Sequence, residues 1–547
     1  MATTLFHGGT IWCGESRGTA HSLLIADGVV VALDDDAERR GAEADERVDL
    51  EGGFLMPSFG DGHAHPIFGG LEAEGPAIRS CTSVDEIVEA VRRYAGEHPE
   101  LSVIRGASYD PTLTADGVFD ARWLDAAVAD RPVVLRASDY HTAWCNSLAL
   151  ERAGITAETP EPELGEIPRR PDGTPAGTLR EWGAVELLTA AVEEPPLETR
   201  IRALERAGAY FLARGVTWVQ DAWVEPADVD VYVAAARAGR IPLRMNLAHY
   251  ADPRRFPAQL AEMQDARAAI DDAGSPLLTA HTVKFFADGV IENETGALLE
   301  PYCSAIHSHG MEVWGPERLA DAVAAVDAAG FQIHIHAIGD AAVRQSLDAI
   351  EHAQRVNGPR DRRAVIAHAQ LVDPDDLARF ARLGVIPTLQ PLWAQLDALM
   401  TVLTMPRLGP ERSARQYPTR TLRDSGARVA FGSDWPVSSG DPRDGIAVAT
   451  SRQTPAGEPA GGWIPEETLP IESALSAYTE GVAHQAFADR SAAPWGVIEV
   501  GSSADLVWLA RDPRAVSPLD LPAVEIRQTY LAGTSRITEG RNGAAAS

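Results

Sequence analysis

The segment His281-Thr-Val-Lys-Phe-Phe-Ala-Asp-Gly289 reads as a buried strand that carries one cation. Seven other short apolar runs resemble it, and amphipathic stretches such as 319–329 separate most of them. Strands that alternate with helices over this length are typical of a parallel (β/α)8 barrel, an α/β fold. The predicted barrel strands are residues 54–59, 217–221, 243–248, 282–287, 331–335, 364–367, 385–389 and 428–432.

The two ends of the chain have a different pattern of short apolar runs and turns. Residues 22–33 include Asp27-Gly28, a typical hairpin turn, and residues 496–501, 504–509 and 526–531 continue the pattern. We therefore expect residues 1–55 and 485–540 to form one small composite β-sandwich domain, with the barrel in 56–484. Residues 70–210 are too many for one crossover after strand 1. They are predicted to be an inserted subdomain over the barrel mouth.

The composition narrows the classes of partner. The net charge is −31, from 79 acidic and 48 basic residues spread along the chain, which argues against nucleic acid and anionic membranes. The first residues show neither a basic region nor a long apolar segment, so a cytoplasmic location is expected. Four scattered cysteines, Cys13, Cys81, Cys145 and Cys303, are expected to be reduced thiols. A small-molecule substrate is expected, and a homo-oligomer stays open.

Lys284 is the only lysine, against 47 arginines. An arginine stays protonated, whereas burial can shift a lysine amine toward its neutral, nucleophilic form. Two chemical roles are open: a carbamate, formed with carbon dioxide, that bridges two metal ions, or a Schiff-base nucleophile. The alternative is a structural lysine whose ammonium group reaches solvent.

Potential metal ligands follow several predicted strands. Reacting groups of barrel enzymes lie at the carboxyl ends of the strands, so these side chains are expected to meet. Neutral imidazole suits zinc, and a carboxylate can also accept a proton from water. His63 and His65 alternate in an extended segment and can reach one ion; His334, deeper in its strand, ranks behind His336. The six candidate ligands are His63, His65, Lys284, His336, His368 and Asp434.

The candidate ligands lie in five short segments: Pro57-Ser-Phe-Gly-Asp-Gly-His-Ala-His65, Val283-Lys-Phe-Phe-Ala-Asp-Gly289, His336-Ala-Ile-Gly-Asp340, Ala367-His-Ala-Gln370 and Gly432-Ser-Asp-Trp-Pro-Val437. In this order the segments resemble the metal-binding motifs of the amidohydrolase superfamily, in particular its YtcJ-like branch, which includes N-substituted formamide deformylases. The resemblance covers most of the chain, and residues 139–147 resemble a further segment of the branch. The chain departs from the branch in two places: it has the carboxylates Glu292 and Glu294 after Lys284, and it has Ala367 where a glutamate is common.

The resemblance implies one or two divalent ions, with zinc expected. His63 and His65 would hold the more buried ion, and His336 and His368 the second. Lys284 would bridge them as a carbamate, and Asp434 would move the proton to the leaving nitrogen. His141 is a candidate for stabilising the oxyanion, or else it packs the insertion against the barrel.

Four tryptophans near strand ends predict an apolar or aromatic substrate: Trp144, Trp223, Trp393 and Trp435. Glu292 is also expected to contact the substrate. The leading hypothesis is a metal-dependent hydrolase that cleaves the C–N bond of an N-substituted amide or formamide. The alternatives are a cyclic amide or ester hydrolase, a deaminase on the same site, a Schiff-base lyase that uses Lys284, and a binding protein with a dead metal site.

Overall fold

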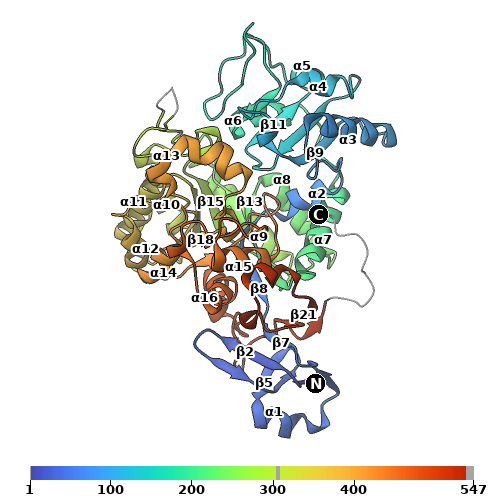
Figure 1. The fold of residues 1–547 in the computed structure, drawn as a ribbon, viewed down its shortest axis with the longest axis vertical. Helices are drawn as coiled ribbons and strands as arrows, with labels where there is room; N and C mark the ends of the chain where they lie inside the picture. Colours follow the sequence, from blue (N-terminus) through green and yellow to red (C-terminus); the bar gives the residue numbers. More distant parts are fainter. Residues whose placement is uncertain (1, 304–307, 537–547) are drawn as a thin grey trace.

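A parallel eight-stranded sheet forms the centre of the computed structural model, which describes residues 2–303 and 308–536 (Figure 1). Neighbouring strands pair in chain order, each with the next. The predicted (β/α)8 fold class is confirmed. The strands are β8 (Phe59–Ala64), β13 (Val216–Val224), β14 (Arg244–Tyr250), β15 (Leu278–Phe286), β16 (Gln332–Ala337), β17 (Val365–His368), β18 (Ile386–Leu389) and β19 (Ala430–Phe431).

The barrel closes just beyond the ends of its first and last strands. The backbone N–H of Asp434 donates to His63 O at 2.7 Å, and that of His65 donates to Trp435 O at 2.7 Å. A Cβ at Gly432 would lie 2.6 Å from the backbone nitrogen of His63, so only glycine allows this approach. The seam of the barrel is therefore made by the segments that carry three predicted ligands.

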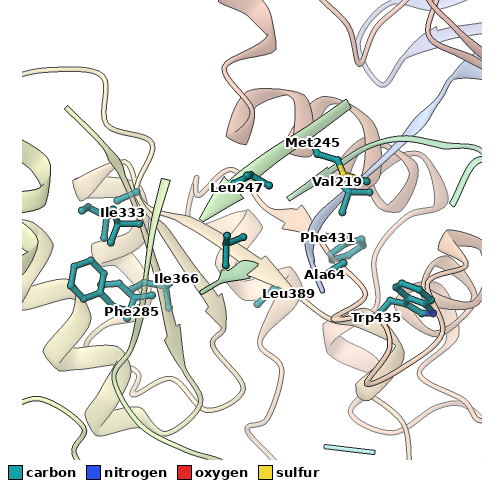
Figure 2. Close-up of a cluster of buried hydrophobic side chains, with 14 of the residues drawn as sticks. Ala64, Val219, Met245, Leu247, Phe285, Ile333, Ile366, Leu389, Phe431 and Trp435 are labelled. Atoms are coloured by element: carbon teal, nitrogen blue, oxygen red, sulfur yellow. The ribbon is translucent and has the colours of Figure 1, made fainter. Parts of the chain in front are cut away.

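Helices cover the outside of the barrel, and their apolar faces pack against its strands. Figure 2 shows part of this core, with Val219, Leu247, Phe285 and Ile366 from four different strands. The first helices of the layer are α2 (Pro66–Glu72), α7 (Leu197–Leu212), α8 (Pro226–Arg237), α9 (Gln259–Asp272), α10 (Pro316–Ala328) and α11 (Asp340–Asn357). It continues with α12 (Leu377–Leu383), α13 (Met405–Ser413), α14 (Thr419–Asp424), α15 (Pro442–Ser451), α16 (Ile471–Ser476) and α17 (Val482–Gln485).

Both ends of the chain contribute to two packed sheets at one end of the molecule, below the barrel in Figure 1. One sheet holds β1 (Thr3–His7), β4 (Leu23–Ala26), β5 (Val29–Leu33) and β6 (Glu46–Asp49), with α1 (Asp34–Arg40) beside it. The other holds β2 (Thr10–Gly14), β3 (Gly18–Ala20), β7 (Phe54–Pro57), β20 (Leu506–Leu509), β21 (Ile526–Leu531) and β22 (Thr534–Ser535).

The predicted first barrel strand, 54–59, is wrong. Phe54–Pro57 is β7, which pairs with β2 and β20 in the terminal sheet, and the barrel strand begins at Phe59. Pro57 ends β7, and Ser58 carries the chain from one sheet to the other. The sequence does not show where β7 ends and β8 begins, because both strands are fully buried and the junction lies within one apolar run, residues 54–59.

A fourth sheet, in strand order β12-β11-β10-β9, lies over the opposite end of the barrel, in the predicted insertion (Figure 1). Helix α7, within the predicted 70–210, packs instead against α2 and β13 in the barrel layer. No helix of the described residues is long and apolar enough to cross a membrane. The insertion contains α3 (Val84–Glu97), β9 (Ile104–Tyr109), α4 (Ala121–Asp125), β10 (Val133–Ala137), β11 (Thr142–Cys145), α5 (Ser147–Arg152), β12 (Thr178–Arg180) and α6 (Trp182–Thr189).

Candidate metal centre

Three of the predicted ligands form a compact buried group at the barrel seam. The Nε2 atom of His65 lies 2.8 Å from Asp434 Oδ1, and that of His63 lies 3.4 Å from the same oxygen. Suitable ligand atoms of His63, His65 and Asp434 all lie within 4.8 Å of one another. Two imidazole nitrogens and one carboxylate oxygen thus face a common point.

The other three predicted ligands adjoin this group. The Nζ atom of Lys284 is 3.4 Å from His63 Nε2, and the rings of His63 and His368 have centroids 4.7 Å apart. His336 lies next, with its ring centroid 4.5 Å from that of His368. All six side chains therefore meet at the carboxyl end of the barrel, as the strand-end argument predicts.

The histidines of this cluster are held in their neutral form. Burial lowers the pKa of His63 and His336 well below the ordinary value, and it lowers that of His368 to about 3. Burial also lowers the pKa of His65, although Asp434 opposes the shift. For Asp434, burial works to raise the pKa, but contact with His65 and the nearby charges leave it below its usual value. Neutral imidazoles beside a carboxylate are the protonation states that a divalent ion requires.

Lys284 is fully buried on β15, and burial lowers its pKa from 10.5 to about 7. Among the described residues, no carboxylate lies within ion-pair distance of its Nζ atom, which sits 4.6 Å from the centroid of the Phe286 ring. The structural alternative, an ammonium group that reaches solvent, is therefore wrong. The amine is instead directed at the ligand cluster.

Several residues that the sequence reasoning did not assign hold the ligands in place. His334 Nε2 lies 2.8 Å from His63 Nδ1, so His63 can donate there and leave Nε2 free to bind. Gln390 Oε1 lies 2.7 Å from His368 Nδ1 and supports that ring in the same way. Buried Asp61 accepts hydrogen bonds from the backbone N–H groups of His63 and Ser433, and so ties the two sides of the seam together.

Asp288 holds the backbone around His336 in place in a similar way. It accepts three backbone hydrogen bonds, from Ala297, Ile338 and Gly339, and its Oδ1 lies 3.6 Å from His336 Nε2. Burial raises its pKa to about 8. Asp61 lies within β8 and Asp288 lies two residues after β15, and both are inside the motif segments, so a buried carboxylate within or just after a barrel strand was an available signal.

The backbone at the centre is strained at two ligands. His368 has φ 73° and Asp434 has φ 56°, in a left-handed region that side chains other than glycine rarely adopt. Such conformations cost of order 1–3 kcal/mol each and persist where the surroundings enforce them, typically at functional sites.

His141 reaches the centre from the inserted subdomain. Its ring centroid is 5.5 Å from that of His336, and its Nδ1 lies 2.7 Å from Glu181 Oε2. Burial lowers the pKa of His141, but the carboxylates of Glu181 and Asp139 outweigh this and raise it overall. Glu181 also accepts a hydrogen bond from Thr295, on the loop after β15, so the pair joins the insertion to the barrel.

Two of the four predicted substrate-binding tryptophans lie at the centre. Trp393 stacks on His368 with centroids 5.3 Å apart, and Trp223 lies 6.4 Å from the His65 ring. Glu292 is half-buried and accepts a hydrogen bond from Thr404 at 2.7 Å. Three further rings complete this aromatic wall and were not predicted: Phe68, Trp182 and Phe286.

The other two tryptophans were placed wrongly. Trp144 is fully buried in the core of the insertion, where it contacts Tyr109 and Phe119. Proximity to His141 in sequence misled the prediction, because residues an odd number of positions apart along an extended segment point to opposite sides, and Trp144 is three residues after His141. Trp435 is 9% exposed and stacks on Tyr210 of α7, on the helical side of the seam, within the buried cluster of Figure 2.

The donor set fits a divalent cation. Asp434 Oδ1 is buried and faces two imidazole nitrogens, yet it has no hydrogen-bond partner at suitable angles. An orphaned carboxylate oxygen amid neutral imidazoles would be costly without a cation. Nitrogen and carboxylate donors together suit zinc and related metals.

Comparison with known proteins agrees with this geometry. The model of the family described as "Amidohydrolase family" matches residues 46–537. The chain belongs to this family. It is 29% identical to the "Putative amidohydrolase YtcJ" of Bacillus subtilis, over 97% of this chain and 98% of that protein. It is 28% identical to the "N-substituted formamide deformylase" of Arthrobacter pascens, over 94% of this chain and 95% of that protein.

A solved structure of an uncharacterized metal-dependent hydrolase from Pyrococcus furiosus is similar to this amidohydrolase family member throughout. The TM-score is 0.72 at 26% identity, and the match covers 94% of this chain and 100% of that one. The protein is therefore a hydrolase of the metal-dependent amidohydrolase family, as its motif segments predicted.

Proposed function

We propose that the protein hydrolyses the C–N bond of an N-substituted amide, with a formamide carrying an apolar or aromatic amine substituent as the favoured substrate class. The observation that carries this proposal is the group His63, His65 and Asp434 beneath a wall of aromatic rings. The similarity to a formamide deformylase supports the same substrate class.

His63, His65, His336 and His368 would hold one or two divalent ions, with zinc favoured by the donor set. Lys284 would bind between them after its neutral amine has added to carbon dioxide and lost a proton, which makes a carbamate. Divalent ions held there would lower the pKa of a water molecule and polarise the substrate carbonyl.

The chain's own groups would then move the proton and stabilise charge. Asp434, buried between His63 and His65, accepts the proton of the attacking water and delivers it to the leaving nitrogen. His141, held by Glu181, donates a hydrogen bond toward the developing oxyanion. Trp223, Trp393 and Phe286 exclude water and hold the apolar substituent.

The test is a substrate screen on protein purified without chelators, with its metal content measured. Benzylformamide and formanilide are compared with lactones, cyclic imides and aminopurines. We expect turnover of the amides, loss of turnover on dialysis against a chelator, and recovery with zinc. A strong preference for aminopurines would establish a deaminase instead, and one for lactones or imides a cyclic ester or amide hydrolase.

Borohydride trapping addresses the Schiff-base alternative. A lysine adduct formed with a carbonyl substrate would identify Lys284 as a nucleophile and exclude the carbamate role. Absence of turnover on every class, with metal fully bound, would favour a binding protein. Neither result is expected, because neither a Schiff-base lyase nor a binding protein would make catalytic use of the complete set of six candidate metal ligands.

A further inference from the structure

A cavity that takes no part in the proposed reaction lies beside the segment that follows Asp434. It encloses about 490 Å³ between α2, α7 and the segment that follows Asp434. Sites for small organic molecules typically have about 300–1,000 Å³, so the volume is sufficient for one. None of the six candidate metal ligands lines it.

The charged groups of this cavity are mainly cationic. Arg79, Arg206 and Arg214 line it together with a single carboxylate, Glu72, although the chain as a whole has a net charge of −31. Outside the lining, Glu74 forms an ion pair with Nη1 of Arg206, which leaves the other guanidinium nitrogens of Arg206 to a ligand. That carboxylate is already neutralised, because Arg79 donates to it through Nε and Nη2 at 2.7 and 2.8 Å.

Arg214 has unused donors at the cavity. Its Nε atom is buried and has no hydrogen-bond partner, and its Nη1 donates to the backbone oxygen of Tyr210. The nearest carboxylate is Asp441, at 4.0 Å from Nε, and Asp441 is itself bound by Arg443. A buried guanidinium N–H without an acceptor is costly, and an anionic ligand would supply the acceptor.

The walls of the cavity are largely apolar. Arg214 lies 3.5 Å above the Tyr210 ring, and Tyr210 stacks on Trp435 with centroids 4.6 Å apart. Trp435 also contacts Gly69, where a Cβ would come within 2.3 Å of the indole. Pro76 and Ile78 complete the wall. A ligand with an apolar body and one anionic group matches this surface.

We propose that this cavity is a binding site for a small organic carboxylate, whose carboxylate accepts hydrogen bonds from Arg214 and Arg206 and whose apolar body packs against Trp435 and Pro76. The cavity shares Ser438 with the metal centre, since the Trp393 indole donates to Ser438 Oγ at 3.1 Å and Trp393 stacks on His368. This proposal does not depend on the reaction assigned to the metal centre.

The test is calorimetric titration of the metal-loaded enzyme with benzoate, and with benzylamine, which has a similar body and the opposite charge. We expect benzoate to bind at one site per chain and benzylamine not to bind. Arg214→Gln and the half-exposed Arg206→Gln should each weaken benzoate binding at least about tenfold, as loss of a charge-assisted hydrogen bond does. Arg420→Gln is the matched control, because Arg420 is exposed on α14 and does not line the cavity.

Metal content and circular dichroism of each variant are measured alongside. Benzoate that binds the metal instead would be insensitive to both arginine substitutions, and that result would overturn the proposal. Equal binding of benzylamine, or no binding of benzoate at millimolar concentration, would overturn it as well. Each of these outcomes is independent of whether the enzyme hydrolyses amides.

Discussion

Replacement of Lys284 by arginine separates a carbamate from an ordinary buried cation. Burial lowers the pKa of Lys284 from 10.5 to about 7. At pH 7 the neutral amine therefore rises from about one molecule in 3,000 to about one in two, which makes carboxylation accessible. A guanidinium keeps the positive charge, cannot be carboxylated and would repel metal ions.

We expect Lys284→Arg to lose bound metal and to reduce kcat/KM at least about 10³-fold, equivalent to about 4 kcal/mol of transition-state stabilisation. Metal is quantified by mass spectrometry, and turnover is followed with the best amide from the screen. Lys284→Ala should be inactive too, but it leaves space for a small acid, so millimolar formate, acetate or propionate should restore part of its activity. No acid should restore Lys284→Arg.

The reasoning is refuted if Lys284→Arg keeps its metal stoichiometry and more than about a tenth of the wild-type rate, since a bridging ligand should be worth several kcal/mol. A structural lysine would give that result. Circular dichroism of both variants distinguishes loss of the ligand from loss of the fold.

Four further substitutions test the surroundings of the centre. Asp434→Asn should lower kcat at least about 10³-fold, because it removes the proton carrier but keeps the side-chain volume; a kcat within tenfold of wild type would exclude that role. Glu181→Gln should lower the pKa of His141, which lies above its ordinary 6.5 because of Glu181 and Asp139. The contribution of this pair to the free energy of unfolding is complete below pH 6.5 and is lost as the pH rises through the raised pKa. Denaturant titrations from pH 6 to 9 should show this pH dependence in the wild type and not in Glu181→Gln. Trp223→Ala should raise KM for aromatic amides with little change in the free energy of unfolding, whereas Trp144→Ala should cost about 3–5 kcal/mol of stability and leave KM unchanged.

The sequence predicted most of the barrel strands, and it predicted a set of side chains that the fold brings together, because both depend on local rules. His63, His65 and His368 come at the ends of apolar runs, and the barrel topology brings such ends together. The errors concern what local sequence does not encode. Phe54–Pro57 is as apolar as a barrel strand, yet it pairs with a strand from the other end of the chain.

The tryptophans show the same limit at the level of side chains. Trp144 and Trp435 each lie close to a site residue in sequence, but the Trp144 ring points into the packed core of the insertion, and the Trp435 ring stacks on Tyr210 of α7. Which way a ring points depends on tertiary partners such as Tyr210, which lies far away in the chain. The supporting role of Glu181 was equally hidden, because it depends on a contact between the insertion and the barrel.

Closure of the barrel at its own metal centre has a consequence for folding. Asp61 and Ser433, which join the two sides of the seam, are 372 residues apart in the chain. Contacts of such sequence separation form late and slowly, since their loop-closure entropy must be overcome first. A nascent or truncated chain therefore cannot assemble this site before its last barrel strand has docked. The rate of metal uptake during refolding should therefore report the rate at which the whole barrel is completed. A bound ion should also slow the unfolding step in which the seam opens.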